Sequence, residues 1–121
     1  MLRAVHSTFP LFALLAVGCV GTSIGDPCLP EAVPEGGFVS NDTYVETSST
    51  SCETRVCLVR GLDGDPSSEC IGDRCAPEAE VREHVYCTAA CAADTDCPDG
   101  FRCADIGASG QLCIKVLPDD L

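Results

Sequence analysis

Eleven cysteines in a chain of 121 residues limit what this sequence can fold into more than any other feature. Cysteine at this density in a short chain is typical of a disulfide scaffold that folds in an oxidising compartment. Beyond residue 20 the large apolar residues stand singly among polar residues, glycines and prolines. A core this thin needs covalent bridges, each of which contributes about 2–4 kcal/mol. We expect a small disulfide-rich domain with minor β content, in short hairpins, and little helix.

The odd number of cysteines draws attention to Cys19, the last residue of the stretch ALLAVGC. It follows a segment that begins with a charge at Arg3 and continues as an apolar run over residues 9–17. A charged start, an apolar run and small residues at the end predict a signal peptide over residues 1–18. The run is shorter than the roughly 20 residues that a membrane-spanning helix needs.

The pentapeptide LAVGC, residues 15–19, resembles the lipobox of bacterial lipoproteins. This resemblance implies a diacylglycerol on the Cys19 sulfur and a further acyl chain on its amine, and several chains anchor a protein stably where one does not. The alternative is that Cys19 is removed with an ordinary signal peptide, cleaved after Gly21 or Gly25. Both fates leave ten cysteines, enough for five bridges. By analogy with lipoprotein sorting, Val20 after the cysteine permits export to the outer membrane.

Three segments are expected along the chain. A lipoprotein-type signal peptide covers residues 1–18, a lipidated N-terminus and flexible tether cover residues 19–36, and the disulfide-rich domain covers residues 37–121. The tether is rich in Gly, Thr and Ser and carries three prolines, without a helical or strand period. Because it also contains Cys28, part of it must be held against the domain.

Short strands are expected where β-branched, aliphatic and aromatic residues cluster. Residues 38–45 favour a hairpin or bulged strand around Asn41-Asp42, and Thr88 to Ala93 favour a helical turn. The other expected strands are Val56 to Val59, residues 101–106 and residues 111–117, the last two on either side of GASG.

Ten cysteines are expected to form disulfides, and their full connectivity cannot be deduced from sequence. We expect Cys91 to pair with Cys103 and Cys97 with Cys113. The two CxxxxC pairs, 52/57 and 70/75, are expected to be local or linked to the cysteines at 87 and 28. The ten are Cys28, Cys52, Cys57, Cys70, Cys75, Cys87, Cys91, Cys97, Cys103 and Cys113.

Two patterns suggest a metal. The CxxxxC pairs have a loose zinc-ligand spacing, but in an exported protein these cysteines are expected to be oxidised. The string DTDCPDG offers the carboxylates of Asp94, Asp96 and Asp99, but Pro98 stands where an EF-hand loop needs its fifth-position ligand. We interpret these acids as turn formers, and expect neither a metal site nor a cofactor.

Catalysis is not expected. His84 is the only histidine after the signal peptide, and bridged sulfurs cannot act as nucleophiles. No GxSxG or HExxH motif and no phosphate-binding glycine loop is present. We interpret His84 as a surface residue at a strand edge.

The net charge of −12 excludes a nucleic-acid partner, because a polyanion would be repelled and no basic stripe offsets the acids. Removal of Arg3 with the signal peptide makes the charge −13.

The lipobox-like start, the CETRVCL segment and the YCTAACAADTDCPDGFRC segment, residues 86–103, together resemble small cysteine-rich lipoproteins of myxobacteria. Among these the chain is most similar to adventurous gliding motility lipoproteins of the CglC type. The resemblance implies a non-catalytic outer-membrane lipoprotein that is held by its lipid, binds or scaffolds an envelope protein, and takes no small-molecule substrate. Gliding machinery is one assembly to which it would contribute.

A second function remains open, a soluble secreted protease inhibitor. In that interpretation a rigid loop such as Ala104 to Gln111 enters the cleft of a protease, and the mature protein carries no lipid.

Overall fold

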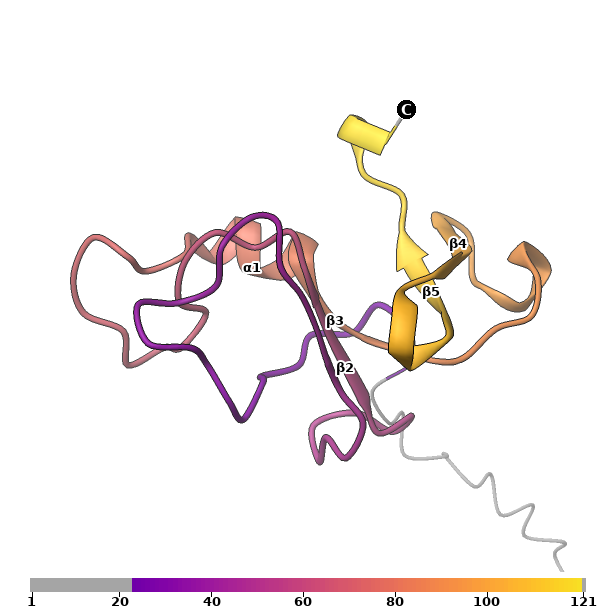
Figure 1. Ribbon diagram of the computed structural model, residues 1–121, viewed down its shortest axis with the longest axis horizontal. Coiled ribbons are helices and arrows are strands. Elements are labelled where there is room, and N and C mark those ends of the chain that lie inside the picture. Colours follow the sequence, from indigo (N-terminus) through magenta and orange to yellow (C-terminus); the bar gives the residue numbers. More distant parts are fainter. Residues whose placement is uncertain (1–22, 121) are drawn as a thin grey trace, which may run out of the picture.

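The computed structural model describes residues 23–120, which form a small, mostly β domain (Figure 1). Five disulfides cross-link this domain. The expected fold class is confirmed. The predicted signal peptide and Cys19 lie outside the described residues. Within residues 23–120 no helix has the length and apolar character needed to cross a membrane. The regular elements are β1 (Thr43–Glu46), β2 (Val56–Arg60), α1 (Glu78–His84), β3 (Val85–Thr88), β4 (Phe101–Asp105) and β5 (Gln111–Lys115).

The first sheet has three antiparallel strands in the order β1-β2-β3. The central strand β2 is the aliphatic run expected from the sequence, and its three middle residues, Cys57, Leu58 and Val59, are fully buried. Both faces of β2 are covered, because its even and odd side chains enter two different clusters. Cys57 and Val59 pack with Phe38, and Leu58 packs on the other face.

Of the two forms expected over residues 38–45, the hairpin is wrong, whereas the bulged strand agrees with the pairing, because Phe38 and Thr43 oppose Gly64 and Arg60 of one antiparallel segment with one extra residue between them. Asn41 does lie in a turn, closed by the N–H of Asp42 donating to the Val39 carbonyl at 2.9 Å, but the two sides of this turn do not pair with each other. Phe38 pairs instead with Gly64, and only residues from Thr43 onward join β2. The Asn41-Asp42 sequence determines the local bend, whereas the pairing partner is a segment distant in sequence, residues 57–64, which packs beside it.

The second sheet is the hairpin β4–β5, with residues paired from Phe101 opposite Lys115 to Asp105 opposite Gln111. Both strands were expected, and the GASG stretch between them forms a short helical turn over Gly107–Ser109. Gly107 and Gly110 have φ values of +83° and +76°, which explains why glycine stands at both positions.

The helix α1 was not expected from the sequence, and the expected helical turn at Thr88 to Ala93 is wrong. Thr88 is the last residue of β3, and the nearest helical turn is Asp94–Asp96. Helix α1 begins after Pro77, carries acids in its first turn and bases in its last, and buries none of its residues fully. It continues directly into β3 at Val85.

Five disulfides connect the strands to the loops. Cys91 pairs with Cys103 and Cys97 with Cys113, as expected. The CxxxxC pairs show both of the expected arrangements, since one is local and the other is linked outward. The three remaining bridges are Cys70–Cys75, Cys28–Cys57 and Cys52–Cys87.

The described part of the expected tether, residues 23–36, lies against the domain. The N–H of Gly25 donates to the carbonyl of Cys87 at 2.8 Å, and the N–H of Cys87 donates to the carbonyl of Asp26 at the same distance. Cys28 is buried and bonded to β2. The ordered domain therefore includes residues before position 37, because these backbone hydrogen bonds and one bridge fix them.

Candidate binding surfaces

All ten cysteines expected in disulfides are found in them, so the sulfurs of the two CxxxxC pairs are bonded to other sulfurs and are not thiolate ligands for zinc. Two groups of sulfurs lie close together, within 4.8 Å, and both are neighbouring disulfides. One group contains Cys28, Cys52 and Cys57, and the other contains Cys91, Cys97 and Cys113. Five bridges are typical of a protein that is exposed outside the cytosol.

The acids of DTDCPDG bind the backbone around them. Asp96 accepts hydrogen bonds from the N–H groups of Ala92 and Ala93 at 2.8 and 3.0 Å, and Asp94 accepts one from the N–H of Cys103 at 2.8 Å. The two backbone hydrogen bonds hold the pKa of the Asp96 carboxyl below its usual value. These contacts support the interpretation of Asp94 and Asp96 as turn formers.

His84 is the last residue of α1 and not a strand-edge residue, so that interpretation was wrong. Its Nδ1 lies 2.8 Å from the carbonyl oxygen of Arg60, and its Nε2 lies 3.3 Å from a carboxylate oxygen of Glu80. Because a carbonyl only accepts, Nδ1 must carry the proton in this contact. The Nδ1 contact holds the end of α1 against the end of β2, whereas the Nε2 contact lies within α1.

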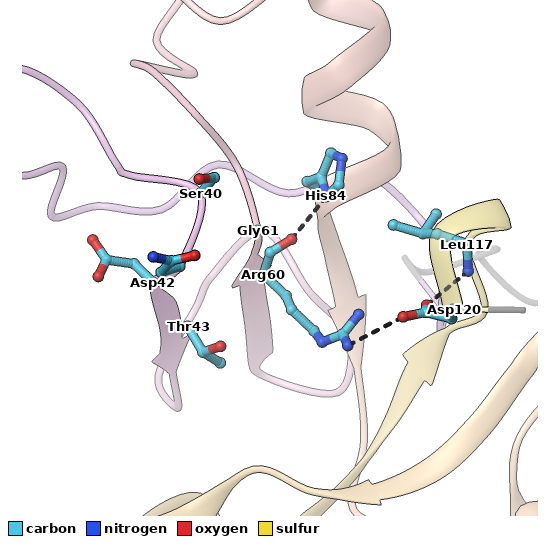
Figure 2. Close-up of a pocket in the computed structure, with 9 residues that line it drawn as sticks. Ser40, Asp42, Thr43, Arg60, Gly61, His84, Leu117 and Asp120 are labelled. Carbon is cyan, nitrogen blue, oxygen red and sulfur yellow. Dashed lines mark hydrogen bonds and ion pairs between the residues drawn. The ribbon is translucent and has the colours of Figure 1, made fainter.

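Beside His84 is a polar hollow of about 440 Å³. Figure 2 shows Ser40, Asp42 and Thr43 on one side, Leu117 and Asp120 on the other, and Arg60 between them. The Arg60 guanidinium lies 3.6 Å from the Asp120 carboxylate, which also accepts a hydrogen bond from the Leu117 N–H. The charge of Arg60 is therefore balanced by the C-terminal turn, and the rest of the polar lining includes the Asp42 carboxylate, the hydroxyls of Ser40 and Thr43 and the amide of Asn41.

The loop from Ala104 to Gln111, named above for the inhibitor alternative, is the tight end of the β4–β5 hairpin. The N–H of Ile106 donates to the Gly110 carbonyl at 3.0 Å, and the Asp105 carboxylate accepts from the Gly107 N–H at 2.9 Å. These bonds fold the loop back on itself.

A second hollow region, which we call the apolar groove, lies beside the first part of α1 and is lined there by Glu78, Val81 and Arg82. It consists of two open hollows of about 610 and 230 Å³ that share Leu29, Pro66, Ser67 and Ser68 as lining residues. The apolar walls are formed by residues from three separate segments. They are Pro27, Leu29, Pro30, Val33, Pro66, Ala76 and Val81.

Directly after the groove residue Glu69 comes the Cys70–Cys75 loop. Its Ile71 side chain is 96% exposed, the most exposed of the large apolar side chains in residues 23–120. The loop is closed by its own disulfide and by Arg74, which donates to the carbonyls of Gly36 and Phe38, each at 3.0 Å. The structure thus holds an apolar side chain in water on a braced loop.

Sequence reasoning identified the cysteines of these surfaces but not their apolar residues. A large apolar residue inside a short cysteine-closed loop, CIGDRC, was the available signal for Ile71. No signal of this kind exists for the groove, whose walls are distant in sequence. No protein-family model matches the chain, and no curated protein or solved structure matches it significantly.

Proposed function

We propose that the protein is a non-catalytic lipoprotein of the outer membrane, anchored through Cys19, whose disulfide-rich domain binds or scaffolds a partner protein in the cell envelope. The observation that carries the exported location is the pairing of cysteines, whereas acylation of Cys19 rests on the lipobox-like sequence that precedes it. All ten cysteines of residues 23–120 are in disulfides, so the eleventh, Cys19, has no cysteine left to pair with in its own chain. Its place at the end of a lipobox-like sequence supports acylation.

The spacing after Cys19 supports a domain that is held close to the membrane. Only residues 20–22 separate Cys19 from Ser23, whose N–H donates to the Asp26 carboxylate at 2.6 Å. Even a fully extended chain gains at most about 3.6 Å for each residue, so at most about 14 Å separates Cys19 from Ser23, where the described domain begins. A lipid at Cys19 would limit the domain to a layer next to the bilayer.

A binding role makes no demand on the groups that the sequence offered as reactive, and these groups are in structural contacts. Both nitrogens of His84 are engaged in structural contacts, and the cysteine sulfurs are bonded to one another. The resemblance to gliding motility lipoproteins supports one such role, in the assembly of gliding machinery.

The experiment is the intact mass of the native protein from membrane and supernatant fractions, before and after reduction and alkylation. We expect a membrane form that begins at Cys19, carries acyl chains and reveals ten thiols only after reduction. Cys19→Ser should abolish the acylated form, whereas Thr22→Ala, three residues further on, should retain it. A soluble, unmodified chain that begins after Cys19 would contradict the proposal, and protease inhibition would then be tested.

A further inference from the structure

We infer that the apolar groove and the neighbouring Ile71 bind another protein through a segment that has an apolar ridge flanked by lysine or arginine side chains. This inference rests on the proposed binding role and names the chemistry of the partner. It is supported by three features of the groove: its exposed apolar walls, its rigid construction and the charge around it.

The first feature is apolar surface kept in water. Leu29 lines the groove and is 58% exposed. Ile71, two residues after the lining residue Glu69, is 96% exposed. Val81 of α1 contributes a further apolar wall while its inner side packs on the core around Val59. Burying these side chains against an apolar ridge would gain about 25 cal/mol for each Å² removed from water.

The second feature is rigidity. The wall around Leu29 is fixed by the Cys28–Cys57 bridge, which ties it to the central strand β2. The opposite wall is fixed where Gly37 and Gly64 pack so closely that a Cβ on Gly37 would lie 2.4 Å from the Gly64 carbonyl carbon. A preformed surface loses little conformational entropy when a partner binds, which favours a recognition role.

The third feature is charge. The charged side chains that line the groove are Glu69, Glu78 and Arg82, and Asp73 stands on the loop beside it. Arg82 and Glu78 balance each other at 3.7 Å, and Arg74 lies 3.1 Å from Asp63, so the negative charge that remains at the groove and its loop is that of Glu69 and Asp73.

The remaining negative charge selects the partner. A second copy of this chain, with its own net charge of −12, and an anionic membrane would both be repelled. Lysine or arginine on either side of an apolar ridge would pair with the carboxylates while the ridge fills the groove. Figure 1 shows the loop that carries Ile71 at one end of the molecule, away from the start of the described chain, so an anchor at the N-terminus would leave it accessible.

The experiment uses the mature chain with Cys19→Ser, which keeps every described residue, and a synthetic amphipathic peptide of leucine and lysine. A peptide with glutamate in place of lysine is its control. Binding is measured by calorimetry in the absence of detergent. We expect the lysine peptide to bind and the glutamate peptide not to bind.

Variants separate the groove from general attraction between opposite charges. Leu29→Asp and Ile71→Asp should each weaken binding of the lysine peptide about tenfold or more. Val39→Asp adds the same charge at an exposed valine, 51% accessible, that does not line the groove, and it should not weaken binding. Because an added carboxylate attracts the peptide, a loss of affinity can only come from lost apolar contact. Circular dichroism of each variant, with its ten cysteines oxidised, verifies the fold.

Equal affinity in all four proteins would overturn the inference, as would equal binding of the glutamate peptide. Two other outcomes would overturn the choice of partner, each in a protein that does not bind the lysine peptide. One is self-association that Ile71→Asp abolishes, and the other is binding to phosphatidylcholine vesicles that Ile71→Asp abolishes. None of these outcomes depends on the lipid, so an acylated Cys19 with an inactive groove would leave the proposed anchor intact. Binding of the lysine peptide by a protein whose native form is not acylated would support the groove as a docking surface and contradict the proposed lipid anchor.

Discussion

At the scale of single residues, Gly64 occupies the point where three backbone segments meet. Its φ is +118°, and a Cβ there would lie 2.7 Å from the carbonyl oxygen of Arg74 and 2.9 Å from the nitrogen of Ala76. Gly72 has a similar φ of +111° but nothing within 4 Å of the same position. The two glycines share a conformation and differ in their surroundings, so each serves as a control for the other.

We expect Gly72→Ala to lower the free energy of unfolding by about 1–2 kcal/mol, the usual cost of a left-handed conformation for an L-residue. Gly64→Ala should lower it by about 3 kcal/mol or more, because steric overlap with backbone adds to that strain. Guanidinium unfolding with the disulfides intact measures both. Equal losses would show that the close packing at Gly64 does not constrain the residue.

Asp65, next to Gly64 in the chain, makes the stability of this region depend on pH. Hydrogen bonds from the Ser67 side chain and from its N–H, the latter at 2.8 Å, hold the pKa of the Asp65 carboxyl below its usual value of 3.8. A carboxyl whose pKa is lower in the folded state stabilises the fold above pH 3.8, and this contribution is lost as the pH falls further.

The stability of the native protein should therefore decrease below about pH 4, and Asp65→Asn should make this decrease smaller. Ser67→Ala, which removes only the side-chain hydrogen bond, should act in the same direction with a smaller effect. Thermal unfolding at a series of pH values from about 2 to 6 measures the slope. An unchanged slope in Asp65→Asn would contradict a stabilising role for this carboxylate.

At the scale of elements, the disulfides differ in how much chain they close. The Cys70–Cys75 bridge has a sequence separation of 5, whereas Cys52–Cys87 has a separation of 35 and connects a buried loop residue to β3. The entropy that a bridge removes from the unfolded chain grows with the length of the loop it closes.

Replacing both cysteines of the short bridge by serine should lower the free energy of unfolding by about 2 kcal/mol, and replacing Cys52 and Cys87 should lower it by about 4 kcal/mol. Replacement of Cys52 and Cys87 should lower the free energy of unfolding more for a second reason, because it puts serine hydroxyl groups where buried sulfur atoms had been. Denaturant unfolding of both double variants tests the order. The reverse order would indicate that the braced loop contributes more to the fold than its size suggests.

The elements also show where sequence reasoning works. Strands β2, β4 and β5 were predictable because each is a local apolar or β-branched run with turn signals beside it. Helix α1 was missed because its seven residues bury no side chain fully and so show no apolar stripe. The acids at its start and the bases at its end were the available signals.

The apolar groove could not be predicted in the same way. Its walls come from segments around Leu29, Pro66 and Val81, and they meet only because Cys28 is bonded to Cys57 and because the backbone around Gly64 packs closely. Ten cysteines allow many pairings, so which distant segments meet is decided by the bridges that form, not by any local pattern.

At the scale of the whole molecule, the disulfides divide the chain into two parts. Three bridges lie entirely within residues 23–88, and the other two lie entirely within residues 89–120. The parts are joined by non-covalent contacts. Ile114 of the second packs on Leu58 and Tyr86 of the first, and the Thr88 hydroxyl donates to the carbonyl of Cys113.

Ile114→Ala should therefore weaken the junction while leaving each part bridged. Loss of a buried isoleucine costs about 2–5 kcal/mol, and Leu62→Ala, in the separate cluster around Val59, is a control with a comparable loss. Elastase, which cleaves after small residues, should cut at Ala89 or Ala90 faster in Ile114→Ala than in Leu62→Ala.

Because no disulfide of residues 23–120 crosses this point, a single cut should release two fragments that separate without reductant, and mass spectrometry identifies them. In the native protein Ala90 pairs with Leu112 and the Ala89 carbonyl accepts from the Cys113 N–H, so cleavage there requires these backbone contacts beside the junction to open. If cleavage instead follows global unfolding, both variants will be cut at similar rates. Faster cleavage in Ile114→Ala alone would establish that the apolar contact around Tyr86 holds the two bridged parts together.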